Sequence, residues 1–215
     1  MKIIDLTHNI SNDMPVFSKD EMPNLKQVNN VQEDGFSQTL INVYSHNGTH
    51  MDAPLHVIEN SLTLDKMDVS NFTGLGIVID CADLVNAKEK VIDISYIEKN
   101  KTNIEKAEFL IFNTGYFHKW GNKDYFKDYP VLHDDVIKYI INHNKKGIGI
   151  DLMSIDTISS EDLPIHNEIL KNNIIIIENL TNLDKLENEL FEFFALPLKY
   201  ENSDGAPVRA IAIIR

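Results

Sequence analysis

The sequence has little that would support disulfide bonds, a membrane span or nucleic-acid binding. Cys81 is the one cysteine among 215 residues, so no disulfide can form within the chain. No apolar run approaches the roughly 18 residues of a membrane span, and the first residues lack the apolar core of a signal peptide. The net charge of −13 disfavours contact with nucleic acid and with anionic membrane surfaces. We therefore expect a soluble cytoplasmic protein with neither kind of partner.

Internal repeats, low-complexity tracts and long linkers are also missing. Glycine and proline are scattered along the chain, and 215 residues suit one hydrophobic core. No glycine-rich phosphate loop follows a predicted strand, which argues against a nucleotide or dinucleotide enzyme. The sequence thus predicts a single compact domain over residues 1–215.

The apolar pattern predicts strands interleaved with helices. Segments rich in β-branched or aromatic residues and flanked by turn residues are predicted as strands: 3–6, 37–45, 76–81, 109–113, 147–151, 174–178 and 209–214. Helical spacing of apolar residues predicts helices at 133–143 and 164–171, with shorter helical pieces at 93–99 and 184–189. Cys81 ends one of the strands and is predicted to be a buried core thiol. This order favours an α/β fold with a mixed or antiparallel sheet and flanking helices.

Histidines and a carboxylate are concentrated in one short segment, at His46, His50, Asp52 and His56. The preceding residues alternate like a half-buried strand. In an extended chain these four positions share parity, so all four side chains can point to one side. A helical zinc-protease motif is excluded, because no glutamate follows the first histidine and Gly48 disfavours helix.

Two imidazoles and a carboxylate form a set of three protein ligands, which leaves an open catalytic position on a zinc ion. Such an ion activates water for hydrolysis. The alternative is that these are polar loop residues, because eight histidines in 215 residues make one close pair unremarkable. The additional aspartate and the further histidine at matching parity favour a metal site.

A second cluster consists of His166 and Glu178. His166 begins a predicted helix, and Glu178 follows a run of four isoleucines, where a lone carboxylate would be costly. A helix of about eight residues advances about 12 Å. A strand of about five residues returns about 16 Å. The two side chains are therefore expected at the same end of the domain. Taken singly, they are equally compatible with a helix cap and a surface carboxylate.

The segment His46–His56 matches every fixed position of the pattern His-x-Gly-Thr-His-x-Asp-x-Pro-x-His. It resembles the kynurenine formamidase or cyclase family of metal-dependent hydrolases. Shorter pieces of the same resemblance follow in the family's order along nearly the whole chain: 4–7 with 14–16, 114–116, 149–151 with Ser154 and Asp156, His166, 178–180 and 205–209.

The resemblance implies a site with one or two divalent ions, most often zinc, with manganese as an alternative. His46, His50 and Asp52 would hold one ion, and Asp52 would bridge to a second ion held by His166 and Glu178. His56 resembles the family's general acid/base, although it could instead be a further ligand. The family fold is a compact α/β domain of the swivelling β/β/α type, usually a homodimer in which a partner chain helps to close the pocket.

The implied activity is arylformamidase hydrolysis of N-formylkynurenine to kynurenine and formate, a step of tryptophan catabolism. One segment departs from the family, because Phe17-Ser18-Lys19 follows Met14-Pro15-Val16 where formamidases typically have Trp-Pro-Gly. Phe17 is expected to line the substrate pocket, with less area than tryptophan and no N–H donor. Opening of a cyclic amide or lactone, as in isatin hydrolases, is the alternative reaction. A metal-binding protein without catalysis is the alternative from another class.

Overall fold

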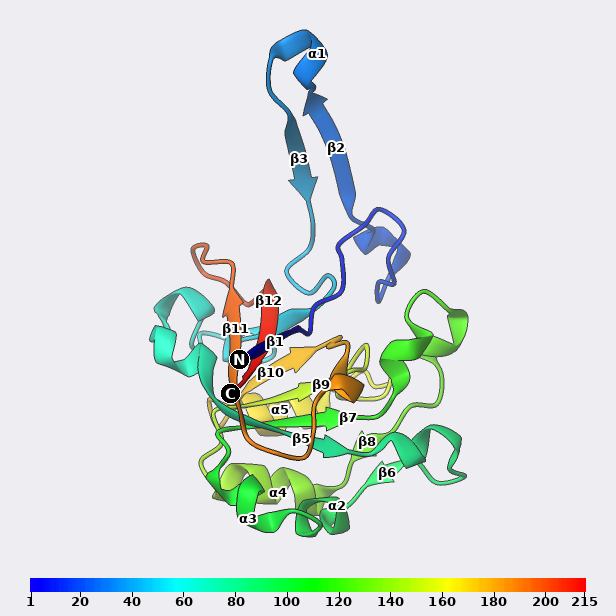
Figure 1. Cartoon of the computed structure of the whole chain (residues 1–215), viewed down its shortest axis with the longest axis vertical. Helices are drawn as coiled ribbons and strands as arrows, with labels where there is room; N and C mark the ends of the chain where they lie inside the picture. Colours follow the sequence, from blue (N-terminus) through cyan, green and yellow to red (C-terminus); the bar gives the residue numbers. More distant parts are fainter.

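The computed structural model describes residues 1–215, and most of its strands belong to one closed sheet (Figure 1). The strands of this sheet are β1 (Lys2–Asp5), β4 (His50–Asp52), β5 (Thr73–Asp80), β7 (Phe109–Asn113), β9 (Gly147–Ile150), β10 (Ile175–Glu178), β11 (Phe191–Pro197) and β12 (Gly205–Ile214). Their order is β1-β12-β11-β5-β7-β9-β10-β4, and β12 also pairs with β4. This additional pairing closes a barrel from which only β1 is left outside.

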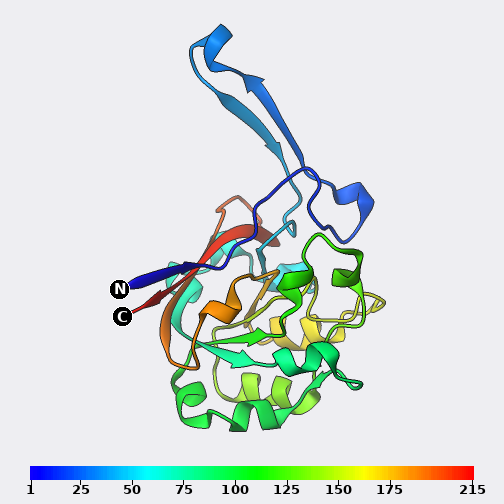
Figure 2. The ribbon, with the colours of Figure 1, turned by 45° about the vertical axis from the view of Figure 1, so that its right-hand side comes forward.

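The sheet is mixed, as the sequence predicts. β5, β7, β9 and β10 are parallel to one another, and the pairs that complete the barrel are antiparallel. β1 pairs antiparallel with the end of β12, so the two ends of the chain lie side by side (Figure 2). The α/β architecture is confirmed, whereas the swivelling β/β/α assignment and the single domain over residues 1–215 stay predictions.

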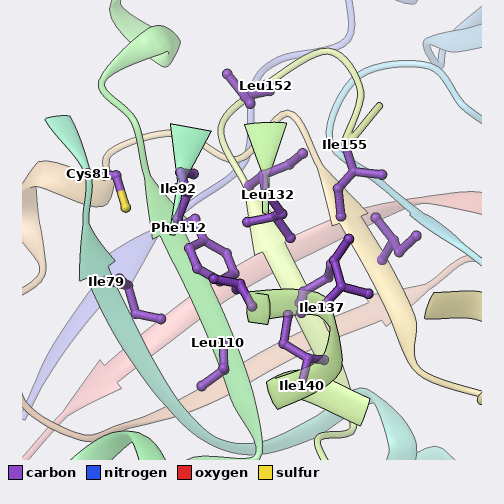
Figure 3. Packing of buried hydrophobic residues seen from close by; sticks show 14 of the residues in the cluster. Ile79, Cys81, Ile92, Leu110, Phe112, Leu132, Ile137, Ile140, Leu152 and Ile155 are labelled. Atoms are coloured by element: carbon purple, nitrogen blue, oxygen red, sulfur yellow. The ribbon is translucent and has the colours of Figure 1, made fainter. Parts of the chain in front are cut away.

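Successive side chains of the strands point to opposite faces of the sheet, and the apolar ones form two hydrophobic clusters. One fills the barrel and includes Met51, Ile111 and Ile177. The other lies between the outer face of the sheet and the helices, and Figure 3 shows Leu110 and Phe112 of this cluster near residues from α4. Because neighbouring side chains of a strand point to opposite faces, the cluster that holds a residue also fixes the direction of its neighbours.

Short helices cover the outer face of the parallel strands. They are α2 (Ile94–Glu98), α3 (Lys101–Lys106), α4 (Asp134–Asn142) and α5 (Pro164–Leu170), beside a short parallel pair of β6 (Val91–Ile92) and β8 (Val131–Leu132). The predicted helices at 93–99, 133–143 and 164–171 are confirmed within a few residues. The helical piece predicted at 184–189 is wrong. The chain forms only a 3₁₀ turn, Leu183–Lys185, because Leu183 and Leu186 alone are buried between 183 and 189. No helix combines the length and the hydrophobicity that crossing a bilayer requires.

A two-stranded hairpin projects from the body of the molecule (Figures 1 and 2). It consists of β2 (Asn24–Asn29) and β3 (Gln38–Asn42), joined at the tip by α1 (Val31–Asp34). The strand predicted at 37–45 is confirmed over Gln38–Asn42, but its predicted half-burial is wrong, because every residue of β3 is exposed. β3 pairs only with β2 and has no layer packed against either face.

Candidate metal centre

The histidine-rich segment is extended over only three residues, His50–Asp52, which form β4. Met51 points into the barrel, so His50 and Asp52 point outward, toward α5. His46 precedes the strand in a turn, and His56 ends a 3₁₀ turn that begins at Pro54. The parity argument therefore explains His50 and Asp52, but the positions of His46 and His56 depend on these turns.

His166 and Glu178 lie at the same end of the domain, as predicted. Glu178 is the last residue of β10 and is paired in register with His50 of β4. His166 lies in the first turn of α5, which packs against β10. Both side chains are buried.

Asp52 is the centre of the cluster, because three histidines surround its buried carboxylate. Asp52 Oδ1 is 2.7 Å from His46 Nδ1 and 3.3 Å from His50 Nε2. Asp52 Oδ2 is 3.7 Å from His166 Nε2. The two oxygens of Glu178 lie 3.5 Å from His50 Nε2 and 3.3 Å from His166 Nε2. The structure thus brings all five predicted ligands together.

Hydrogen bonds orient the rings of His50 and His166. His50 Nδ1 donates to Gly48 O at 2.9 Å, and His166 Nδ1 donates to Asp156 Oδ2 at 2.7 Å. Asp156 also accepts from the backbone N–H groups of Ile165 and His166. In both rings Nε2 is left facing the two central carboxylates, as is typical of metal-binding histidines whose other nitrogen is hydrogen-bonded.

The electrostatics of the cluster favour positive charge. Burial alone would lower the pKa of His46 and of His166, but the neighbouring carboxylates raise these pKa values to about 10 and about 12. Burial alone would raise the pKa of Asp52, yet the charge of His50, the nearby imidazole of His166 and the hydrogen bond from His46 hold this pKa well below its usual range. The site therefore stabilises cations.

The donor set fits a divalent metal ion. Asp52 Oδ2 is buried and has no hydrogen-bond partner among the protein atoms, a costly state that an ion would relieve. Imidazole and carboxylate groups are the usual ligands of zinc, and both also bind manganese. Two triads have ligand atoms within 4.8 Å of one another, His46 with Asp52 and His56, and His50 with Asp52 and Glu178. His56 therefore has the position for either of its expected roles, ligand or acid/base.

A pocket of about 210 Å³ opens beside the cluster. Its lining includes the imidazoles of His46, His50, His56 and His166 together with Phe17, Glu21, Tyr44, Ser45, Met153, Ser154, Leu163 and Glu178. Phe17 is among the lining residues, and more than half of its surface is exposed. Burial lowers the pKa of His56 to about 4, so its imidazole is neutral at pH 7.

Sequence reasoning missed several supporting residues. Asp204 accepts a hydrogen bond from the ring of His46, and Gly205 lies against the same ring. Asn179 donates to Gly48 O and accepts from the Tyr125 hydroxyl. The resemblance included Gly205 and Asn179 among its shorter pieces, but nothing in the spacing showed what they contact.

Residues 4–157 match the model of the "Putative cyclase" family. The chain belongs to the cyclase family. Among cyclase relatives, a protein of Methanocaldococcus jannaschii is 33% identical over 218 residues that span 100% of both chains. A kynurenine formamidase of Bacillus thuringiensis subsp. konkukian is 29% identical over 211 residues, which cover 97% of this chain and 95% of the relative.

Solved structures share the cyclase fold. An isatin hydrolase bound to the product analogue thioisatinate superposes with a TM-score of 0.89 at 23% identity, over 99% of this chain and 92% of the other. A protein of Bacillus stearothermophilus described as a predicted metal-dependent hydrolase has a TM-score of 0.74 at 26% identity, over 98% and 97% of the two chains. The cyclase fold therefore extends over the whole chain, beyond the residues that the family model matches.

Proposed function

We propose that the protein is a metal-dependent amidohydrolase of the arylformamidase type, which converts N-formylkynurenine to kynurenine and formate. The observation that carries the proposal is the convergence of His46, His50, His166 and Glu178 on the buried carboxylate of Asp52, next to a pocket. The likeness to kynurenine formamidases along 97% of the chain supports the choice of an aryl formamide as substrate.

In this proposal His46, His50 and Asp52 would hold one ion, and Asp52 would also be a ligand of a second ion held by His166 and Glu178. Zinc is the first candidate for both ions, and manganese is the alternative. A bound divalent ion would polarise the amide carbonyl and lower the pKa of a water molecule to about 7.

The protein's own groups bind the substrate and move its proton. The ring of Phe17 offers a face on which the substrate aryl group can stack. His56 lies over His46, with 3.9 Å between the ring centroids, and it borders the pocket. Its neutral imidazole accepts a proton as the nucleophile attacks and returns it to the leaving nitrogen, which cannot depart as an anion.

Opening of a cyclic amide is the second candidate reaction. The isatin hydrolase structure, which superposes along 99% of the chain, favours this alternative. The two reactions require the same carbonyl chemistry and differ in whether the cleaved nitrogen stays attached to the product.

We also propose that the protein is a homodimer in which the β2–β3 hairpin contacts the second copy. An isolated two-stranded hairpin is only marginally stable in water. This hairpin nevertheless exposes apolar side chains on its strands and tip, namely Val28, Val31, Phe36, Leu40 and Ile41. The chain leading into it contributes Phe17 and Glu21 to the pocket lining, and Tyr44 follows it, so a second copy on the hairpin would border the pocket.

Metal analysis of protein purified without chelator, followed by assays on formanilides, lactams and lactones, tests the function. We expect one or two divalent ions per chain and the fastest turnover on an aryl formamide. Asp52→Asn should lose both ions together, whereas Glu178→Gln should mainly weaken the second. Absence of stoichiometric metal, with no activity after zinc or manganese is added, would contradict the proposal. Full metal retention in Asp52→Asn would exclude a shared ligand.

A further inference from the structure

The histidines around Asp52 are oriented in two different ways. In His50 and His166, Nδ1 donates to an acceptor outside the cluster, and Nε2 faces the central carboxylates. In His46 the arrangement is reversed. Its Nδ1 is 2.7 Å from Asp52 Oδ1, and its Nε2 is 3.0 Å from Asp204 Oδ2.

We infer that Asp204 is a positioning residue, which accepts the Nε2–H of His46 and thereby keeps Nδ1 facing Asp52 Oδ1, where an ion would bind between the two groups. This inference rests on the proposed metal-dependent function. Asp204 would thus do for His46 what Asp156 does for His166, although the two aspartates come from different ends of the site.

Asp204 is itself held in place by its neighbours. The Ser45 hydroxyl donates to Asp204 Oδ2 at 3.2 Å, and the Tyr200 hydroxyl donates to Asp204 Oδ1 at 3.1 Å. The backbone carbonyl of Asp204 accepts from the N–H of Ala53 at 2.8 Å, immediately after β4. The backbone of Asp204 is therefore fixed to the end of the strand that carries two of the predicted ligands, and the two hydroxyls hold its carboxylate.

Gly205 supplies the space that the His46 ring needs. It is paired in register with Asp52, and its backbone lies directly against the imidazole. A Cβ at this position would overlap all three of the nearest ring atoms, so any other residue would displace the ring. Asp204 and Gly205 thus act together, because one fixes the ring by a hydrogen bond and the other leaves room for it.

A carboxylate on the outer nitrogen of a metal-bound imidazole fixes the tautomer, orients the ring and makes the inner nitrogen a better ligand. Loss of such a partner typically weakens metal binding by about 10- to 100-fold. The geometry also predicts opposite tautomers within one site, with hydrogen on Nε2 of His46 and on Nδ1 of His50 and His166.

The first experiment titrates zinc into the full-length apoprotein against a chromophoric chelator. Asp204→Ala should weaken the affinity for one ion by about 10- to 100-fold, and Asp204→Asn by less, because its amide oxygen can still accept. Glu201→Ala is the matched control, since it removes an exposed carboxylate from the same β11–β12 connection and should bind zinc like the wild type. Unchanged affinity in Asp204→Ala would overturn the inference. A wild-type protein that binds no ion would instead contradict the proposed function.

The second experiment needs no variant and so does not depend on how well Asp204→Ala folds. Long-range ¹H–¹⁵N spectra of the zinc-loaded wild type report which ring nitrogen of each histidine carries hydrogen. A proton on Nε2 of His46, with protons on Nδ1 of His50 and His166, is the expected result. A proton on Nδ1 of His46 would overturn the role of Asp204 even if the protein binds zinc and hydrolyses its substrate.

Discussion

Among single residues, Asp52 has the most demanding environment. Its carboxylate is completely buried, and a buried charge is stable only when it is paired or binds a metal. Asp52 contacts three histidines, so a change at this position affects every part of the site at once. Residues at the edge of the cluster can instead be substituted one at a time, so that the role of each is measured separately.

The role of His56 can be distinguished from that of the metal ligands by comparing substrates with different leaving groups. If it is the proton donor, His56→Ala should keep its metal content and lose about 10²- to 10⁴-fold in kcat. An anilide, whose nitrogen needs a proton, should suffer more than an activated ester, whose phenolate leaves unaided. His50→Ala should instead lose metal and activity toward both substrates. Measuring metal content and the rates on a matched anilide and ester distinguishes the two roles. Loss of the ion in His56→Ala would show that His56 is a ligand.

Phe17 should influence substrate binding more than chemistry. Its ring lines the pocket, so Phe17→Ala should raise KM for an aryl formamide because face contact with the substrate ring is lost. Val69→Ala is the control within the same chain, because Val69 is an exposed apolar residue that does not line the pocket. Steady-state kinetics on aryl substrates would show unchanged KM and kcat if Phe17 had no contact with the substrate.

His8 should make stability depend on pH. Its ring stacks on Trp120 at 4.0 Å, and burial lowers its pKa from 6.5 to about 4. The unfolded chain therefore takes up this proton first. The stabilisation from neutral His8 is complete above pH 6.5 and is lost as the pH falls through about 4. His8→Phe keeps an aromatic ring on Trp120, so it should lose less stability between pH 7 and pH 4.

Urea denaturation at several pH values measures this difference. His143→Phe is the matched control, because His143 also stacks on an aromatic ring, that of Tyr139, but is exposed. Parallel stability curves for wild type and His8→Phe would show that His8 does not contribute to the acid sensitivity.

At the scale of elements, the sequence predicts the buried parallel strands, but it does not predict the strands whose apolar pattern is short or interrupted. The prediction at 109–113 coincides with β7, and those at 147–151 and 174–178 differ from β9 and β10 by one residue, because continuous apolar runs between turns identify strands buried on both faces. β11 was missed because Glu192 interrupts its apolar pattern. β4 was not recognised as a separate strand, since its three residues derive their conformation from pairing with β10 and β12.

The candidate ligands could be predicted from residue type and spacing, but their supports could not. His166 and Glu178 were placed correctly because helix and strand lengths determine where the chain returns. Asp204 is 158 residues from His46, and only the closure of the barrel brings them together. Nothing local in the sequence distinguishes Asp204 from other surface aspartates.

The glycines of β9 should be sensitive to small additions of volume. A Cβ at Gly149 would lie 2.6 Å from Leu180 Cδ1, so Gly149→Ala should lower the free energy of unfolding by about 1–3 kcal/mol. Gly35→Ala, at the hairpin tip, meets no atom within 4 Å and bears only the cost of its positive φ, about 1–2 kcal/mol. Chemical denaturation compares the two variants. Equal, small effects would mean that β9 shifts to admit the methyl group.

For the whole molecule, the hairpin provides the test of the homodimer. Leu40 and Ile41 are more than half exposed on β3, so Leu40→Lys with Ile41→Lys should produce monomers that are still folded. Gln38→Lys with Thr39→Lys adds the same charge to exposed polar positions of the strand and should leave the dimer intact. Sedimentation equilibrium measures both. A monomeric wild type, or a double-lysine variant at 40 and 41 that still dimerises, would contradict the role of the hairpin.

The seam of the barrel also bears on how the chain folds. β4 joins β10 and β12, whose residues follow it by more than 120 positions, and the candidate ligands lie on both sides of this seam. Contacts between such distant segments form late, because closing the long intervening loop costs entropy before any contact offsets it. The metal centre would thus be assembled in the last stage of folding. An ion bound there would stabilise the closed barrel and slow its unfolding.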